Sequence, residues 1–362
     1  MIYTYKHIPH PIEKFNTEIE FFFKQLFKYN PKKYDEGKLI RPNFLKLVNA
    51  SPDRLKGSLE KLTLAYHSLN IKDKNILKSA FEKNRKISAA CKDQRMHLIK
   101  YDEIANQSFK LLLKDFFTML WEEYPQNQLI ETKFGTVQSH FQSLTNPTHQ
   151  KAFVCPFCGL QSLKPNSSIY RNAYDHFVPK SMYPFISIDF QNLFPICHEC
   201  NSDEKKRADT LYKSGKRRKA LHPYSKNYKS DKLSIAIALK ETYNTQNLKT
   251  LLEFINWEYV IKFAGKDTPM LKTWDDIYQI KRRYKEYVLT YQKTWFEDIL
   301  IKRYREDLQD GLTFVRFKQK LLRESKDQIQ YPLGMLRFVY FNFLFAVPAF
   351  ENKLKSIIQK KP

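Results

Sequence analysis

Residues 155–206 read CPFCGLQSLKPNSSIYRNAYDHFVPKSMYPFISIDFQNLFPICHECNSDEKK, and a Cys-x-x-Cys pair stands near each end of this segment. The first pair is Cys155 and Cys158, and the second is Cys197 and Cys200. A two-residue spacer lets both sulfurs of a pair turn toward one ion, so two pairs complete a tetrahedral shell of four thiolates. Such a shell leaves no open coordination position. The segment therefore predicts a structural zinc ion rather than a catalytic one.

The cysteine count supports this interpretation. Five cysteines are present in the 362 residues, and only Cys91 lies outside the two pairs. An odd number of cysteines is a poor framework for disulfides and a good one for a metal site. The alternative, four unconnected buried cysteines, leaves the matched spacing without a reason. His198 lies inside the second pair and could replace a cysteine ligand, but we expect it to point outward.

Polar residues suited to phosphodiester hydrolysis lie between and beside the cysteine pairs, namely Asp175, His176, Asn192 and Asn201. Histidine is the side chain best able to deprotonate water near neutral pH. A hard divalent cation stabilises the departing oxygen and prefers carboxylate and amide oxygens as ligands. Asp175 and Asn201 supply such a pair of ligands, and bound zinc would bring their two segments together.

Each of these residues also has an ordinary structural interpretation. Taken alone, Asp175 and Asn192 are typical of turns, and His176 is typical of a loop histidine with satisfied hydrogen bonds. Asn201 is typical of a helix N-cap, where backbone N–H groups and the helix dipole also favour a bound phosphate. The occurrence of all four residues between and beside two zinc-binding pairs favours a nuclease-like site.

The segment resembles the HNH family of nucleases, in the form that carries a four-cysteine zinc site. The resemblance is carried by the order of the two cysteine pairs, Asp175-His176, Asn192 and Asn201. It implies a ββα-metal core, also called a His-Me finger, in which two strands and a helix hold one Mg²⁺ or Mn²⁺. On this resemblance His176 is the general base, and Asp175 and Asn201 are the ligands of the catalytic metal. Asn192 would hold the loop that bears His176.

The charge of the chain is consistent with a polyanionic partner. There are 62 Lys and Arg residues against 38 Asp and Glu residues, a formal net charge of +24. Such an excess attracts nucleic acid first and an anionic membrane second. The alternative is a composition rich in lysine throughout, so charge alone does not establish nucleic-acid binding. We expect phosphate-backbone contacts, without sequence readout, from Lys180, Lys205, Lys206, Arg207, Lys216, Arg217 and Arg218. The alternative for the basic run after the core is a solvated surface loop.

The sequences on both sides of the core are typical of helices. Only 8 glycines are present, which argues against a turn-rich all-β fold. Apolar residues recur at the spacing of a buried helix face at Phe109, Leu112, Leu113, Phe116 and Leu120. The sequence therefore predicts an α+β chain that is mostly helical. We expect a helical domain over residues 1–148, the nuclease domain over 149–226 and a second helical domain over 227–362.

A long helix is predicted between Ile277 and Ile299, with Thr273 as a candidate cap and Gly311 as a candidate stop. Aromatic residues follow one face of it at Tyr284, Tyr287, Tyr291 and Trp295. This face could be imagined as a stacking platform for bases, but the helical spacing favours a core face.

The sequence predicts a cytoplasmic protein without a membrane partner. No apolar run follows the first residues, so no signal peptide is expected. The most apolar stretch, residues 335–350, contains Arg337 and Asn342 and is interrupted by Pro348. It is too short and too polar to span a bilayer, and we expect it to form a core helix.

These features together predict a metal-dependent HNH endonuclease that hydrolyses DNA and nicks one strand per active site. A bacterial restriction or antiphage-defence effector is one biological setting for such an enzyme. A protein partner or regulator that contacts the helical flanks is expected, or a homodimer. Two alternatives remain open: a zinc-dependent nucleic-acid-binding module that does not cut, and an RNase or toxin-type HNH effector.

Overall fold

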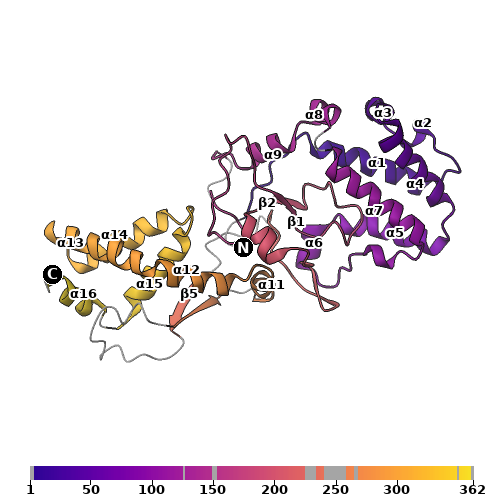
Figure 1. The fold of residues 1–362 in the computed structure, drawn as a ribbon. Coiled ribbons are helices and arrows are strands. Elements are labelled where there is room, and N and C mark those ends of the chain that lie inside the picture. Colours follow the sequence, from indigo (N-terminus) through magenta and orange to yellow (C-terminus); the bar gives the residue numbers. More distant parts are fainter. Residues whose placement is uncertain are drawn as a thin grey trace. The chain divides into compact units, whose positions relative to one another are not determined.

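The computed structural model describes residues 4–124, 127–148, 153–224, 234–239, 258–264, 268–348 and 350–359. Helices predominate in these residues, and each sheet that they contain is an antiparallel pair of strands (Figure 1). The expected α+β class and mainly helical character are therefore confirmed.

The chain divides into two compact units, neither of which is one continuous stretch. The larger unit consists of Tyr5–Gln150 and Lys164–Ser225, and the smaller unit consists of Met1–Thr4, Lys151–Leu163 and Lys226–Pro362. Residues 153–163 belong to the smaller unit because they pack on its helices, where Trp274 Nε1 donates to the Phe157 carbonyl oxygen at 2.7 Å. This division differs from the three contiguous domains expected from the sequence. Independent folding of residues 149–226 stays a prediction.

Helices of the larger unit form where the apolar spacing predicts them. The helix α7 (Gln107–Glu122) begins after Asn106, whose side chain accepts the N–H of Phe109, and it buries most of the predicted apolar face. The other helical elements are α1 (Glu13–Tyr29), α2 (Glu36–Leu39), α3 (Pro42–Asn49), η1 (Pro52–Lys56), α4 (Gly57–His67), α5 (Ile71–Asn84), α6 (Ile87–Lys92), η2 (Tyr101–Glu103), α8 (Gln128–Phe134) and α9 (Val137–Leu144).

Aromatic rings join several of these helices into one core. The ring centroid of Phe23 in α1 lies 5.7 Å from that of Phe117 in α7 and 6.3 Å from that of Phe81 in α5. The central segment, residues 155–206, contributes Phe185. The centroid of its ring lies 5.0 Å from that of Phe23, in the edge-to-face arrangement that aromatic pairs favour. The central segment is therefore fixed to the helices by a buried aromatic contact.

Two short strands carry the candidate catalytic residues. The strand β1 (Tyr174–His176) pairs antiparallel with β2 (Leu193–Pro195), with Asp175 opposite Phe194 and His176 opposite Leu193. The loop of residues 177–192 joins them and buries Phe185 and Ile188 in the helical core. A helical segment, η4 (Glu199–Lys205), follows β2. The hairpin of β3 (Tyr212–Lys213) and β4 (Lys216–Arg217) comes after it.

The smaller unit pairs β5 (Ser234–Leu239) with β6 (Tyr259–Ala264). Its helical elements are α11 (Thr268–Tyr278), α12 (Ile280–Thr294), η7 (Trp295–Ile301), α13 (Lys302–Gln309), α14 (Phe314–Asp327), α15 (Gly334–Ala346) and α16 (Phe350–Gln359). The single helix expected between Ile277 and Ile299 is wrong, because Gln279 has φ 49° and separates α11 from α12. Thr273 lies inside α11 and is no cap, whereas Gly311, with φ 78°, follows α13 as expected.

Most of the predicted apolar faces of this unit are buried. Tyr284 and Trp295 belong to the core, although Tyr291 between them is 36% exposed. The apolar stretch 335–350 contributes α15, whose Leu336 and Phe341 are buried as expected of a core helix. Among the described residues, no helix combines the length and the apolar character needed to cross a membrane.

Candidate metal centre and active site

Four cysteines of the central segment lie together. The Sγ atoms of Cys155, Cys158, Cys197 and Cys200 are all within 4.8 Å of one another, and all four side chains are buried. Zn–S bonds of about 2.3 Å place the sulfurs of a tetrahedral site about 3.8 Å apart, so a small inward shift completes the shell. The cluster can therefore hold one zinc ion, as the sequence predicts.

The backbone around the first pair supports a thiolate ligand. Leu160 donates its backbone N–H to Cys158 Sγ at 3.4 Å, which stabilises negative charge on the sulfur. Gly159 has φ 67°, a conformation that favours glycine, and its N–H donates to the Cys155 carbonyl oxygen at 2.8 Å. The Tyr284 hydroxyl donates to the Cys158 carbonyl oxygen at 2.6 Å. These hydrogen bonds fix the turn that holds Cys155 and Cys158 on the same side.

The second pair leads into η4. Cys200 lies inside this helical segment, which begins at Glu199. Asn201 is therefore the third residue of η4, and the expected N-cap at Asn201 is wrong. Asn201 and Lys205 are four residues apart in η4, so their side chains leave the segment on the same side. The side chain of His198 is 83% exposed and points outward, as expected.

Asp175, in the middle of β1, has one paired and one unpaired carboxylate oxygen. Its Oδ1 accepts a hydrogen bond from Lys205 Nζ at 3.0 Å. Its Oδ2 is buried and has no hydrogen-bond partner in the described part of the chain. Burial raises the pKa of Asp175, and the Lys205 ammonium opposes this by lowering the pKa. A buried oxygen without a partner is costly, and a divalent cation would satisfy it.

Lys205 lies inside the site and does not face solvent. Its side chain is 2% exposed, and Nζ donates to the His176 carbonyl oxygen at 2.9 Å as well as to Asp175. An ammonium in this position does not reach a DNA backbone at the surface, so the role expected for Lys205 is corrected. Lys205 instead neutralises Asp175 and joins η4 to β1.

One backbone group fixes the ring of His176. Its Nε2 lies 2.7 Å from the Ser187 carbonyl oxygen, which can only accept, so Nε2 carries the proton of the neutral ring. The lone pair then lies on Nδ1, which forms no hydrogen bond within the residues described. Burial lowers the pKa of His176 to about 3, so the ring is neutral at pH 7. Trp121 of α7 packs edge to face with it, with 4.9 Å between ring centroids.

Asn192 holds the loop that follows His176. Its side chain accepts the Val178 N–H at 2.8 Å and donates to the Val178 carbonyl oxygen at 2.9 Å. It also donates to the Ile186 carbonyl oxygen at 3.3 Å, and it is fully buried. Asn192 therefore joins both ends of the loop that carries Ser187, which is the supporting position expected for it.

Arg217 and Arg218 face the protein. The five N–H donors of the Arg217 guanidinium reach five carbonyl oxygens at 2.5 to 3.1 Å, those of Met96, Leu211, Arg218, Ala90 and Asp93. Arg218 donates to the carbonyl oxygens of Asp209 and Thr210. Arg217 keeps no donor for a phosphate, so the expected DNA contact is corrected. Its guanidinium fastens β4 to the end of α6.

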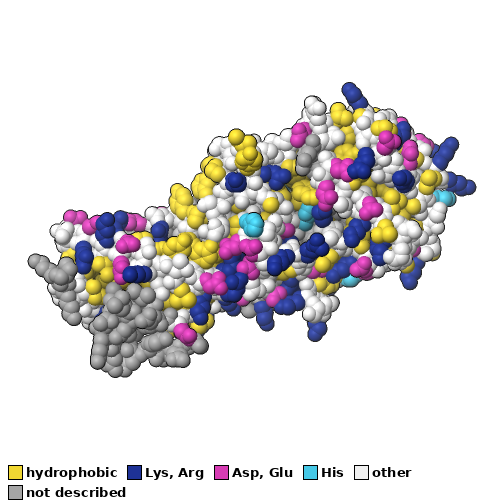
Figure 2. Space-filling view, in the orientation of Figure 1, with side chains coloured by type: hydrophobic (Ala, Val, Ile, Leu, Met, Phe, Trp, Pro, Cys, Tyr) yellow, Lys and Arg dark blue, Asp and Glu magenta, His cyan; other side chains and the backbone are white. Residues whose placement is uncertain are grey.

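The remaining predicted phosphate contacts are more accessible. Lys180 pairs with Glu122 of α7 at 3.2 Å. Lys206, Arg207 and Lys216 are exposed. On the face of the described residues that Figure 2 shows, Lys and Arg side chains lie among Asp and Glu side chains rather than in one continuous patch. Any phosphate contact in this region therefore depends on individual cations.

The β3–β4 hairpin presents two of these cations at its turn. Ser214 and Gly215 have φ 49° and 76°, the left-handed pair that a tight two-residue hairpin turn requires. Lys213 lies directly opposite Lys216 across this turn, and both are exposed. The turn therefore places two lysines on the same exposed end of the hairpin.

Two contributors to the site have no signal in the sequence. Ser187 acts through its backbone carbonyl, which every residue type possesses. Trp121 comes from α7, far from the central segment in the chain, and its spacing only predicts a helix face. Folding of the loop 177–192 against the helices brings both to His176.

No protein-family model matches the sequence, and neither the curated proteins nor the solved structures give a match. The function is therefore inferred from the residues of the site and their chemistry.

Proposed function

We propose that the chain is a metal-dependent endonuclease of the HNH type that hydrolyses phosphodiester bonds in DNA and carries a structural zinc ion. The observation that supports it most is the unpaired, buried Oδ2 of Asp175 directly beside His176 in β1. A buried oxygen without a hydrogen-bond donor is suited to bind a cation. The adjacent imidazole of His176 has its lone pair on Nδ1. The chain order of two antiparallel strands, β1 and β2, followed by the helical segment η4 supports the proposal, although η4 is a seven-residue π-helix where a ββα-metal core has an α-helix.

Asp175 and Asn201 would hold the catalytic Mg²⁺ or Mn²⁺. Such an ion, when bound, stabilises negative charge on the phosphate and on the departing oxygen. Asp175 offers the free Oδ2, because Lys205 occupies only Oδ1. The side chain of Asn201 leaves η4 on the same side as that of Lys205, and the Lys205 ammonium reaches Asp175. The amide oxygen of Asn201 is a ligand that suits a hard cation.

His176 would act as the general base through Nδ1. The Ser187 carbonyl oxygen accepts the Nε2 proton and therefore stabilises the imidazolium that forms when Nδ1 takes a proton from water. An anionic phosphate beside the ring raises the pKa of His176 from its low value, because negative charge favours the protonated form. The water attacks phosphorus and leaves 5′-phosphate and 3′-hydroxyl ends. One such site cuts one strand, so a monomer nicks.

The exposed cations Lys206, Arg207 and Lys216 would hold the DNA backbone without reading its sequence. Lys206 directly follows η4, and Lys216 lies at the turn of the β3–β4 hairpin. Both lysines are therefore close in the chain to Asn201, the proposed metal ligand. A restriction or antiphage-defence effector is one biological setting in which such an enzyme would act.

A nucleic-acid-binding module that does not cut is the second candidate function. The observation that favours it is the ion pair between Lys205 and Asp175, because the ammonium already neutralises the carboxylate that a metal would use. In that case Asp175 and His176 are structural, and binding to DNA survives their replacement.

Cleavage of supercoiled plasmid by the purified full chain distinguishes the two candidates. The endonuclease proposal predicts open-circular product with Mg²⁺ or Mn²⁺, and no product with EDTA or with Asp175→Asn. Binding of the plasmid without product at any metal concentration would instead support the binding module. A labelled RNA of the same sequence tests the remaining alternative, since cleavage of RNA with intact plasmid identifies an RNase.

A further inference from the structure

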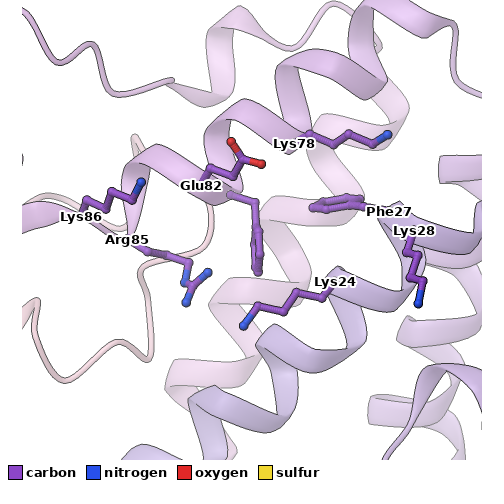
Figure 3. A pocket seen from close by; sticks show the side chains of 8 residues that line it. Lys24, Phe27, Lys28, Lys78, Glu82, Arg85 and Lys86 are labelled. Carbon is purple, nitrogen blue, oxygen red and sulfur yellow. The ribbon is translucent and has the colours of Figure 1, made fainter.

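A pocket of about 440 Å³ lies in the larger unit between α1 and the end of α5 (Figure 3). We call it the α1–α5 pocket, and its lining consists of Lys24, Phe27, Lys28, Lys78, Phe81, Glu82, Arg85 and Lys86. None of these residues belongs to the candidate active site. The volume falls within the range of small-molecule sites in proteins.

The charge of this lining strongly favours an anion. Five of the lining residues are cations and one is a carboxylate, a formal balance of +4. Glu20, which is not a lining residue, pairs with Arg85 at 2.5 Å and with Lys24 at 3.6 Å. Within the described residues, Lys28, Lys78 and Lys86 form no ion pair. Three ammonium groups without an ion pair therefore line one hollow, and a multivalent anion would neutralise several of them at once.

The pocket also has an aromatic wall. The rings of Phe27 and Phe81 meet edge to face with 5.5 Å between centroids, and the Arg85 guanidinium lies 4.5 Å from the Phe81 centroid. Phe27 is only partly buried, so its ring is available to a flat ligand group. Phosphates beside cations and a base beside an aromatic ring are the two contacts that a nucleotide makes. We propose that the α1–α5 pocket binds a small nucleotide with several phosphate groups.

The floor of the pocket touches the loop that orients His176. Phe81 and Phe27 lie 5.4 and 6.3 Å from Phe185, which has φ 72° and precedes Ser187 by two residues. Asn84, at the end of α5, donates to the Pro184 carbonyl oxygen at 3.2 Å. A ligand that shifts the end of α5 therefore shifts the carbonyl that fixes the His176 ring. Nucleotide binding itself does not depend on the proposed nuclease function. The coupling to His176 rests on that proposed function when the coupling is measured as cleavage.

Calorimetric titration of the full chain with ATP tests the binding. We expect saturable binding that Lys78→Glu/Lys86→Glu weakens by about tenfold or more, because two phosphate contacts are reversed in sign. The control Lys72→Glu/Lys83→Glu places the same charges on exposed positions of α5 outside the pocket and should leave the affinity unchanged. Tripolyphosphate should bind more weakly than ATP because it lacks the base, and adenosine should not bind measurably.

Other outcomes of that titration overturn the proposal. Absence of ATP binding at millimolar concentration does so, and so does equal weakening by the control variant. A duplex oligonucleotide whose affinity falls in the pocket variant while ATP binds unchanged would make the pocket a DNA contact instead.

The coupling has a readout that needs no cleavage. Trp121 packs on His176, so ATP should change the tryptophan fluorescence of the wild type and not that of Trp121→Phe. An unchanged Trp121 signal with saturating ATP contradicts the coupling, whether or not the plasmid is nicked. If fluorescence and binding respond but no substrate is ever cut, the proposed nuclease function fails and the nucleotide site stands.

Discussion

The Lys205 ammonium lies 3.0 Å from Asp175 Oδ1, and both side chains are almost completely buried. A buried ion pair of this kind is stabilising only while both partners are present, because either charge alone is left without water or a counterion. The pair also leaves Asp175 Oδ2 unpaired. Lys205 therefore positions the carboxylate through Oδ1 alone, and Oδ2 is the oxygen that the proposed catalytic cation would use.

Substitution of Lys205 should destabilise the fold more than substitution of its neighbour Lys206. Lys205→Met leaves the buried Asp175 charge without a partner, and we expect a loss of about 3 to 5 kcal/mol in the free energy of unfolding. Lys206→Met, at an exposed position, should change it by less than about 0.5 kcal/mol. Urea denaturation measures both. Equal effects of the two variants would show that the Lys205 pair does not stabilise the fold.

Metal content tests the cysteine cluster. The purified protein should contain one zinc ion per chain, and Cys158→Ser should lose most of it, because a hydroxyl is a poor substitute for a thiolate ligand. Cys91→Ala is the matched control, since Cys91 is also buried but lies outside the cluster. Chelation of the zinc should lower the thermal midpoint by an amount that added zinc restores. Retention of full zinc content by Cys158→Ser would rule out this ligand set.

Arg217 and Lys216, neighbours in β4, should differ in role: Arg217 should affect stability, and Lys216 should affect DNA binding. Arg217→Ala removes five hydrogen bonds to backbone carbonyls and should cost about 2 to 4 kcal/mol of stability. Lys216→Ala should leave stability unchanged but reduce the salt dependence of DNA binding by about one unit of slope. Filter binding between low and high salt measures the slope. A reduced slope for a folded Arg217→Ala and none for Lys216→Ala would reverse these assignments.

Stability should fall in mild acid because histidines are buried in the neutral form. Burial lowers the pKa of His140 to about 3 and that of His222 to about 4. The unfolded chain binds protons at these residues below about pH 6.5, whereas the folded chain does not, so acid favours unfolding. Between about pH 6.5 and pH 4 the free energy of unfolding should fall by about 1 kcal/mol per pH unit for each histidine.

Substitution of the buried histidines checks this sign. His140→Gln/His222→Gln should show a shallower dependence of stability on pH over the same interval, even if its stability at pH 7 is lower. His198→Gln is the control, because that side chain is already 83% exposed in the folded chain. A pH dependence as steep in the double variant as in the wild type would mean that other groups cause the acid sensitivity.

Local patterns allowed part of the structure to be predicted. The two Cys-x-x-Cys spacings predicted the metal cluster, and the apolar spacing around Phe109 and Phe116 predicted α7, because both depend on neighbours in the chain. Asp175 and His176, which the motif singled out, lie together in β1. Local spacing carries this information because strand and helix periods are fixed by backbone geometry.

The direction in which a side chain points, and the group that it contacts, could not be predicted from the same patterns. Arg217 and Lys205 belong to a basic run, and nothing local shows that one reaches the carbonyls at α6 and the other a buried carboxylate. The break at Gln279 depends on a left-handed backbone that the helical pattern hides. The α1–α5 pocket joins Lys24 and Lys78, which are distant in sequence, so only the packing of aromatic residues in the core brings them together.

Single-turnover cleavage of supercoiled plasmid with Mg²⁺ by wild type and by His176→Ala tests whether the chain is an HNH-type endonuclease. We expect His176→Ala to slow nicking by at least about a hundredfold while zinc content and DNA affinity are retained, because the base at Nδ1 is lost. The control His67→Ala, in α4, should cleave at the wild-type rate. Metal-dependent nicking by His176→Ala at the wild-type rate would show that His176 is not the general base.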